Sequence, residues 1–321
     1  MTQANEKTTV SFVIPCYRSA KTIGGVVEEI VRTMEAEPLS ARYAFEIVLV
    51  CDGSPDNTYE VIKDIAAKQP QVTGIDLASN FGQHAALMAG LRETKGDIVA
   101  CLDDDGQTPA DQCDRLLEKI REGYDAVYAS YDHKQHNGYR NFGSRLNDWM
   151  TRVMLGKPRE LKVTSYFAVK RFVVDEMIRY ENAYPYVIGL VLRVTKHITN
   201  VPVDHRKREI GESGYTFGKL FALWLNGFTA FSIKPLRMAT ACGGLLAAFG
   251  FVYGIWTVIK HVFIDPSQPQ GWSALMSAVL FIGGVVLIML GLIGEYIGRV
   301  YVSMNAAPQY VIREKTGAHT S

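Results

Sequence analysis

Three consecutive carboxylates, Asp103, Asp104 and Asp105, form the most chemically distinctive stretch of the sequence. They end an apolar run, Asp97–Asp103, that predicts a buried β-strand. Adjacent negative charges at such a strand end repel one another unless a cation compensates them. Carboxylate oxygens suit Mg²⁺ or Mn²⁺, which bind through one or two carboxylates together with substrate phosphates. The run therefore indicates a divalent-cation site, with a solvated acidic loop as the alternative.

Alternating strands and helices must position this acidic run. Apolar, β-branched segments predict further strands, and amphipathic segments predict helices between them; the strands are Thr9–Cys16, Phe45–Cys51, Val72–Leu77 and Asp125–Ser130, and the helices are Lys21–Met34, Asn57–Lys68, His84–Glu93 and Pro109–Glu122. This alternation is typical of a mainly parallel α/β sheet covered on both faces, in which ligands bind beyond the carboxyl ends of the strands. The loops after Cys16, Cys51, Leu77 and Asp103 should therefore line one site.

Composition and missing motifs exclude several classes. The 321 residues carry a formal net charge of +1, with 48 % hydrophobic and 21 % charged residues, which fits neither a disordered chain nor a protein that binds nucleic acid by bulk charge. The sequence has neither GxGxxG after a strand nor GxxxxGK[ST], so a Rossmann dehydrogenase or a P-loop NTPase is not expected. Five scattered cysteines are typical of buried thiols in a reducing compartment.

Two segments near the C-terminus predict membrane spans. Residues 238–259 and 272–293 each contain 22 residues without a charge, a length of about 33 Å as helix against a hydrocarbon core of about 30 Å. Lys and Arg residues flank the outer ends of the two segments, whereas Lys260 is the single Lys or Arg of the hairpin between them. The positive-inside rule then places both termini in the cytoplasm, with the protein in the inner membrane. Two buried helices of a soluble core are the alternative.

These patterns divide the chain into consecutive parts. Residues 1–210 are expected to form the α/β domain, and residues 211–237, which are apolar and aromatic with interspersed cations, to form interfacial helices. A last core helix of the soluble domain is the alternative for that segment. The remaining parts are a first span at 238–259, an external hairpin at 260–271, a second span at 272–293 and a cytoplasmic tail at 294–321.

Five motifs in order, followed by two spans, resemble family-2 glycosyltransferases of GT-A fold; the motifs are VIPCYRS, VCDGSPDNT, NFGQHAALMAGL, LDDDGQTP and REIGESGYTF. The similarity is greatest to the polyprenyl-phosphate branch, which includes dolichol-phosphate mannose synthase, bactoprenol glucosyltransferase and undecaprenyl-phosphate aminoarabinose transferase. It implies a Rossmann-like catalytic domain, a nucleotide-sugar donor such as a UDP-sugar, Mg²⁺ or Mn²⁺ as cofactor, and a homo-oligomer, by resemblance a tetramer. The QxxRW signature of processive synthases is missing.

The resemblance also implies roles for individual residues. It places the loop containing Pro15, Tyr17 and Ser19 along the nucleotide and assigns Asp52 to the edge of the base, with Cys51 where the family commonly has a second acid. Asp103 and Asp105 match the ends of the DxD motif, Gln107 matches a further metal ligand, and Arg208 matches an arginine that contacts phosphates. Asp104 replaces the usual alanine of the motif and either joins this nucleotide and metal site or faces solvent.

The implied reaction moves a sugar to the phosphate of a long isoprenoid lipid such as undecaprenyl phosphate, with inversion at the anomeric carbon. A phosphate oxygen is already anionic at neutral pH, so no strong general base is needed. Arginine forks suit phosphate, and the basic residues expected near the lipid headgroup are Arg140, Arg145, Arg206 and Lys207, although surface charge is the alternative for the first two.

Two alternatives remain open. The acceptor of a GT-A enzyme is in many cases a sugar hydroxyl on a lipid-linked molecule, which would require a carboxylate base, and Asp104 and Glu212 are the candidates in this sequence. The other alternative is a membrane-anchored subunit that binds a nucleotide-sugar without turnover. Gly214, where the mannose branch often has lysine, makes that branch less probable, and the sugar itself is not identified by the sequence.

Overall fold

The computed structural model describes residues 7–131, 158, 160–204, 206, 271–304 and 308–317, and scattered positions between 241 and 263. The chain divides into two compact units, of which the first comprises residues 1–217 and 306–321 and the second residues 218–305. The predicted interfacial segment at 211–237 lies outside the described residues.

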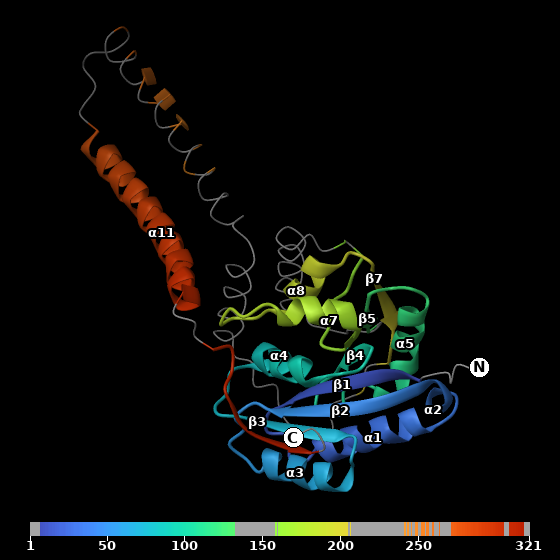
Figure 1. Ribbon diagram of the computed structural model, residues 1–321. Helices are drawn as coiled ribbons and strands as arrows, with labels where there is room; N and C mark the ends of the chain where they lie inside the picture. Colours follow the sequence, from blue (N-terminus) through green and yellow to red (C-terminus); the bar gives the residue numbers. More distant parts are fainter. Residues whose placement is uncertain are drawn as a thin grey trace. The chain divides into compact units, whose positions relative to one another are not determined.

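The first unit is built on an eight-stranded sheet in the order β7-β5-β6-β4-β1-β2-β3-β8 (Figure 1). The strands are β1 (Thr8–Cys16), β2 (Tyr43–Cys51), β3 (Val72–Leu77), β4 (Ile98–Cys101), β5 (Ala126–Ser130), β6 (Phe167–Lys170), β7 (Ile198–Pro202) and β8 (Ile312–Gly317). Four neighbouring pairs are parallel, and β6 and β8 supply the antiparallel pairings. The mainly parallel α/β sheet predicted from the sequence is therefore confirmed.

Helices cover both faces of this sheet, as the continuous apolar strands require. The helices α1 (Ile23–Glu35), α3 (Thr58–Lys68) and α5 (Cys113–Arg121) contribute buried side chains to one core cluster together with the short α2 (Leu39–Arg42). The opposite face is covered by α4 (Gln83–Glu93), α7 (Arg171–Ile178) and α8 (Val187–Val194) (Figure 1). A 3-10 turn, η1 (Ala110–Gln112), precedes α5.

Close approach of α4 to the sheet explains the small residues on that helix. A Cβ added to Gly90 would lie 2.4 Å from a methyl carbon of Val13 on β1, so only glycine lets the helix approach this closely. Seven consecutive residues of α4, from Ala85 to Leu91, are buried. The helix is therefore held in one register on the sheet, and its first residue points toward the carboxyl edge.

Strand β8 corrects the prediction of a C-terminal tail at 294–321. Residues 294–304 continue a helix, and β8 pairs antiparallel with β3, so residues 312–317 belong to the eight-stranded sheet. Arg313 on β8 donates to the buried carboxylate of Asp76 over 3.0 Å and to the carbonyl oxygen of Ala78 over 2.7 Å. The predicted boundary at residue 210 therefore omits the last strand of the domain.

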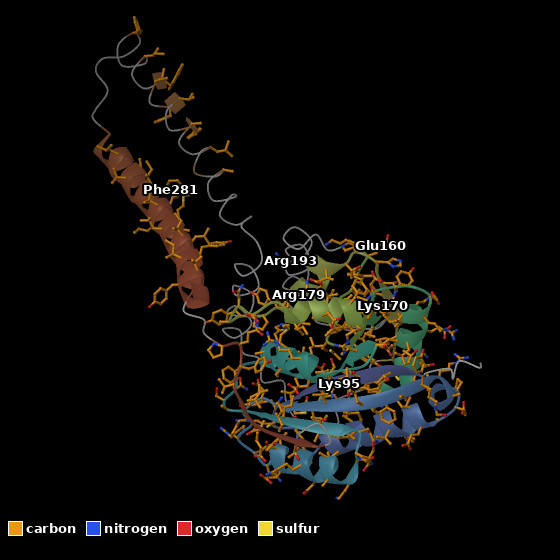
Figure 2. The ribbon with its side chains drawn as sticks, in the orientation of Figure 1. Lys95, Glu160, Lys170, Arg179, Arg193 and Phe281 are labelled. Atoms are coloured by element: carbon orange, nitrogen blue, oxygen red, sulfur yellow. The ribbon has the colours of Figure 1, made fainter. Side chains whose placement is uncertain are left out.

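The second unit contains one long apolar helix, α11 (Trp272–Met304). Its segment Phe281–Gly298 is long and apolar enough to cross a membrane, with a mean hydropathy of 2.0 and no burial within the described structure. Phe281, labelled in Figure 2, is one of many exposed apolar side chains on this helix. The second predicted span thus falls within a helix that runs 11 residues beyond Ile293.

The first predicted span, 238–259, lies partly outside the described residues. Every position that the structure describes between 241 and 263 is helical, and the large apolar side chains there are exposed, for example Leu245 and Phe249. A Cβ added to Gly243 would lie 3.4 Å from the terminal carbon of Met289 on α11, so the two helical segments pack against each other at this glycine.

Candidate active site

The loops that follow β1, β2, β3 and β4 meet at the carboxyl edge of the sheet, as predicted. Asp104 joins the first of these loops to the last, because its Oδ2 accepts hydrogen bonds from the backbone N–H of Tyr17 over 3.0 Å and from the hydroxyl of Ser19. Burial raises the pKa of Asp104, and these two donors oppose that rise. The carboxylate of Asp104 therefore faces the loop after β1 and not solvent.

Asp52 lies at the end of β2 and is held by backbone donors. The N–H of Phe81 donates to its Oδ1 over 2.7 Å, and the N–H of Gly82 donates to its Oδ2 over 2.9 Å. Only 4 % of the residue is exposed, and burial raises its pKa against the effect of the two amides. Asp52 thus fixes the segment that leads into α4, a contact that the expected role at the base edge did not include.

Gly53 explains part of the DGS pattern after β2. It adopts φ +55°, and an added Cβ would lie 2.2 Å from the carbonyl carbon of Ser79. A side chain at this position would therefore clash with the backbone of the neighbouring loop. The glycine lets the loops after β2 and β3 pass each other, which brings residues 80–83 to the site.

Asp103 is the most perturbed carboxylate of the site. Its Oδ1 accepts from the side-chain amide of Gln83 over 3.0 Å, and its Oδ2 accepts from the hydroxyl of Ser165. Burial raises its pKa to about 6, and repulsion from Asp105 and Asp104 adds to the rise against the hydroxyl and amide donors. The group therefore ionises at a cost near neutral pH, which a bound cation would remove.

Gln83 and Ser165 were not predicted from the sequence. Ser165 precedes β6, and the antiparallel pairing of Phe167 with Cys101 brings it level with the acidic loop at residues 103–105. Nothing local in the sequence marks that pairing. Gln83 is the first residue of α4 and lies within the NFGQHAAL motif, so its position after a strand was a usable signal.

The rest of the acidic loop turns back on itself. Asp105 Oδ1 accepts from the backbone N–H of Gln107 over 3.0 Å, across Gly106 at φ +72°. The carbonyl oxygen of Gln107 accepts from the backbone N–H of Arg206 over 3.3 Å. Arg206, within the predicted basic run at residues 205–208, is therefore hydrogen-bonded to the acidic loop.

Arg206 itself contacts carboxylates. Its guanidinium donates to Glu29 on α1 over 2.8 Å and to Asp111 in η1 over 2.7 Å. These two acids neutralise the cation and tie the segment after β7 to the first helix. Of the other predicted phosphate-binding residues, Arg140, Arg145, Lys207 and Arg208 lie outside the described residues.

The donor atoms fit a divalent cation that completes its coordination with a substrate. Among the described residues, no three or more His, Cys, Asp and Glu side chains converge into a complete metal cluster. Asp103 and Asp105 carry hard carboxylate oxygens, and Gln107 on the same loop carries a side-chain amide oxygen, so these residues could hold such an ion together with a substrate. Mg²⁺ and Mn²⁺ are commonly held in this way, by two carboxylates with the remaining positions left to phosphates and water.

Among the described residues, His84 is the histidine that directly follows Gln83, the partner of Asp103. His84 lies at the start of α4 with its ring edge-on to that of Tyr186, 5.1 Å between centroids. Its Nδ1 is buried without a hydrogen-bond partner among the described residues, and burial lowers its pKa to about 4. The imidazole is therefore neutral at physiological pH and packs as a ring of the domain's interior.

The arrangement of strands and carboxylates defines a glycosyltransferase of GT-A fold. The family description "Glycosyl transferase family 2" matches residues 11–177, and "GtrB C-terminal hairpin" matches residues 234–300. The chain belongs to glycosyltransferase family 2, and the resemblance inferred from its motifs is confirmed.

Curated relatives match along nearly the whole chain. The undecaprenyl-phosphate 4-deoxy-4-formamido-L-arabinose transferase of Yersinia enterocolitica is 32 % identical over 99 % of this chain and 97 % of its own length. The transferase of the same name from an Enterobacter species is 33 % identical over 98 % of this chain and 95 % of its own length.

Solved structures show the same fold at lower identity. Glucosyl-3-phosphoglycerate synthase from Mycobacterium tuberculosis, in complex with Mn²⁺, UDP-glucose and phosphoglyceric acid, has a TM-score of 0.50 at 20 % identity over 68 % of this chain and 76 % of its own. Mannosyl-3-phosphoglycerate synthase from Rubrobacter xylanophilus has a TM-score of 0.52 at 20 % identity over 72 % of this chain and 74 % of its own.

Proposed function

We propose that this glycosyltransferase moves a sugar from a nucleoside-diphosphate sugar, a UDP-sugar in the first instance, to undecaprenyl phosphate or a similar polyprenyl phosphate. One observation carries the proposal: the carboxylate site lies in a unit whose chain leaves into an apolar helical unit and returns from it. The names of the relatives that match end to end support the same acceptor.

The connectivity supports two membrane crossings. Because β8 pairs with β3, the chain after α11 is on the same side of a membrane as the catalytic sheet. If α11 crosses once, residues 218–271 must cross an odd number of times, and 238–259 is the charge-free stretch there long enough to do so. With the flanking cations, this favours a multi-pass protein of the inner membrane with both termini cytoplasmic.

The donor diphosphate would be held through the acidic loop. Asp103, Asp105 and Gln107 would hold Mg²⁺ or Mn²⁺, which orients the diphosphate and stabilises charge on the leaving nucleotide. Ser165 and Gln83 fix the carboxylate of Asp103, and Asp104 holds the loop of Tyr17 and Ser19 against it. Pro15, Tyr17, Ser19 and Asp52 would form the seat of the nucleotide.

A phosphate acceptor agrees with the chemistry of the described side chains. Its oxygen is anionic at neutral pH and attacks the anomeric carbon without a general base. Asp104, one of the two carboxylates considered as a base for a hydroxyl acceptor, already accepts from Tyr17 and Ser19. A single in-line displacement inverts the anomeric carbon.

Basic residues would bring the lipid phosphate to the site. Arg208 follows the segment hydrogen-bonded to Gln107 by two residues, which supports its proposed contact with phosphate in catalysis. Lys207, Arg140 and Arg145 are proposed in the same role. Arg206 is better assigned to the clamp with Glu29 and Asp111, since both acids already neutralise it.

A transfer assay tests the function. Purified protein in detergent with Mn²⁺, undecaprenyl phosphate and a panel of nucleotide-sugars that includes UDP-4-deoxy-4-formamido-L-arabinose is analysed by mass spectrometry. The expected product is a sugar joined to undecaprenyl phosphate through one phosphate. Transfer only to a hydroxyl-bearing glycolipid, or binding without turnover across the panel, would contradict the proposal. The same preparation, analysed by size in detergent, tests the homo-oligomer expected from the resemblance.

A further inference from the structure

Arg18, directly after Tyr17, has an unusual backbone conformation. Its φ of +59° lies in the left-handed region, and no other described non-glycine residue has a positive φ. A residue with a Cβ is strained there, and such strain persists only where the surroundings impose it, most often at functional sites. The strained backbone therefore marks Arg18 as a candidate functional residue.

Two neighbouring loops and the start of α3 impose this conformation. The N–H of Arg18 donates to the hydroxyl of Ser54 over 2.8 Å, and the N–H of Ser19 donates to the hydroxyl of Thr58 over 2.9 Å. The preceding N–H, that of Tyr17, donates to Asp104. Three successive amides are thus held by the loop after β2, the start of α3 and the acidic loop, which leaves the backbone of Arg18 no freedom to relax.

The guanidinium is exposed beside the site and free of carboxylates. Its central carbon lies 5.5 Å from the centroid of the Tyr17 ring, and both side chains are exposed. Among the described residues it makes no ion pair, although Asp52, Asp56 and the acidic run lie on the loops that hold its backbone. Cation–π contact with Tyr17 keeps the fork near the rim of the site.

The charge of the site favours a further cation beside the donor diphosphate, in addition to the basic residues proposed for the lipid phosphate. A nucleoside diphosphate-sugar brings two negative charges to a place already lined by aspartates, and one divalent ion does not neutralise both sets. Arg206 is not available, since Glu29 and Asp111 occupy its guanidinium. A planar guanidinium can donate two parallel hydrogen bonds to one phosphate group.

We propose that Arg18 is a donor-binding residue whose guanidinium binds the phosphate oxygens of the nucleoside diphosphate. This inference rests on the proposed function, because it requires a nucleotide to bind beside the loop that holds Asp104. The left-handed backbone then lets the loop place the guanidinium beside the Tyr17 ring while Tyr17 and Ser19 hold Asp104.

Isothermal titration of full-length protein with UDP and Mn²⁺ tests the assignment. Arg18→Gly removes the side chain and suits φ +59°, so it should keep or raise the melting temperature. We expect UDP affinity to fall about tenfold or more, as the loss of a charge-assisted pair predicts. Arg18→Lys, which keeps the charge and loses the fork, should fall between wild type and Arg18→Gly.

A charge-matched control separates a contact from general electrostatics. Arg32 is exposed in the last turn of α1, and Arg32→Ala removes the same charge far along the helix from the loop. UDP affinity within twofold of wild type for Arg18→Gly, or an equal loss in Arg32→Ala, would overturn the assignment. Wild-type protein that neither binds UDP nor transfers sugar would instead contradict the proposed function, and this inference with it.

Discussion

Two aspartates follow strands at the same edge of the sheet, and different kinds of hydrogen-bond donor stabilise their carboxylates. Asp52, after β2, accepts from two backbone amides of the segment before α4. Asp103, after β4, accepts from two side chains, beside two further carboxylates that help to raise its pKa to about 6. Backbone partners cannot rotate away, whereas side chains can exchange for a ligand. We therefore expect Asp52 to hold the segment before α4 in place as well as to line the proposed nucleotide site, and Asp103 to exchange a side-chain partner for the proposed cation.

The largest effect should follow from removing a charge at the second strand end. Asp105→Asn should lower transfer activity by roughly a hundredfold or more, since a cation ligand and its electrostatic stabilisation of the leaving group are lost. Asp114→Asn, at an exposed position in the first turn of α5, removes the same charge away from the site and should leave activity unchanged. Full activity in Asp105→Asn, measured with the nucleotide-sugar panel, would show that the acidic loop does not serve catalysis.

Removing the carboxylate of Asp52 should lower the stability of the folded protein even when no nucleotide is present. Asp52→Ala leaves the N–H groups of Phe81 and Gly82 without their acceptor, at a cost of about 1–3 kcal/mol for each unsatisfied group. Asp52→Asn keeps one acceptor oxygen and should lose less stability. Thermal unfolding without nucleotide or metal measures both changes. An unchanged melting temperature in Asp52→Ala would remove the distinction between the two strand ends.

Thermal unfolding of Asp103→Asn without nucleotide or metal should show a gain in stability, whereas Asp52→Ala should show a loss. Burial makes the folded state hold this proton more tightly than the unfolded state does, so in metal-free protein this group lowers stability as pH rises from about 4 to about 6. The asparagine variant should gain up to about 3 kcal/mol above that window, because one pKa unit corresponds to about 1.4 kcal/mol, and nothing below it. A gain that does not depend on pH would point to packing instead of charge.

A third buried acid, Asp76, extends the comparison, and we expect the smallest change in stability when its partner is removed. Asp76 on β3 is 5 % exposed and is paired with Arg313 of β8 over 3.0 Å. Arg313→Ala should cost about 1 kcal/mol, because water screens the exposed arginine but the acid stays buried. Lys63→Ala breaks an exposed pair with Glu60 within α3 and should cost almost nothing. Thermal unfolding compares the two, and equal losses would argue against a role of the buried acid.

Regular elements were predictable because they depend on local patterns. The strand predicted at Val72–Leu77 has those bounds in the structure, and the helix predicted at His84–Glu93 begins one residue earlier. The strand predicted to run to Asp103 ends at Cys101, because the three following carboxylates turn away from the ladder. Strand β8 was missed, since Ile312–Gly317 is short, charged and placed by pairing with β3.

The sequence by itself determined the α/β order, the acidic loop, the family and a long apolar helix, because each is written in contiguous residues whose period or charge is read locally. Tertiary structure decided which partner each aspartate has. The sequence does not distinguish the three aspartates by their partners: Asp52 accepts from backbone amides, Asp103 from two side chains, and Asp104 from the loop after β1. Hydrogen bonding joins residues 20 to 90 positions apart, and only the packing of strands brings such distant groups within reach.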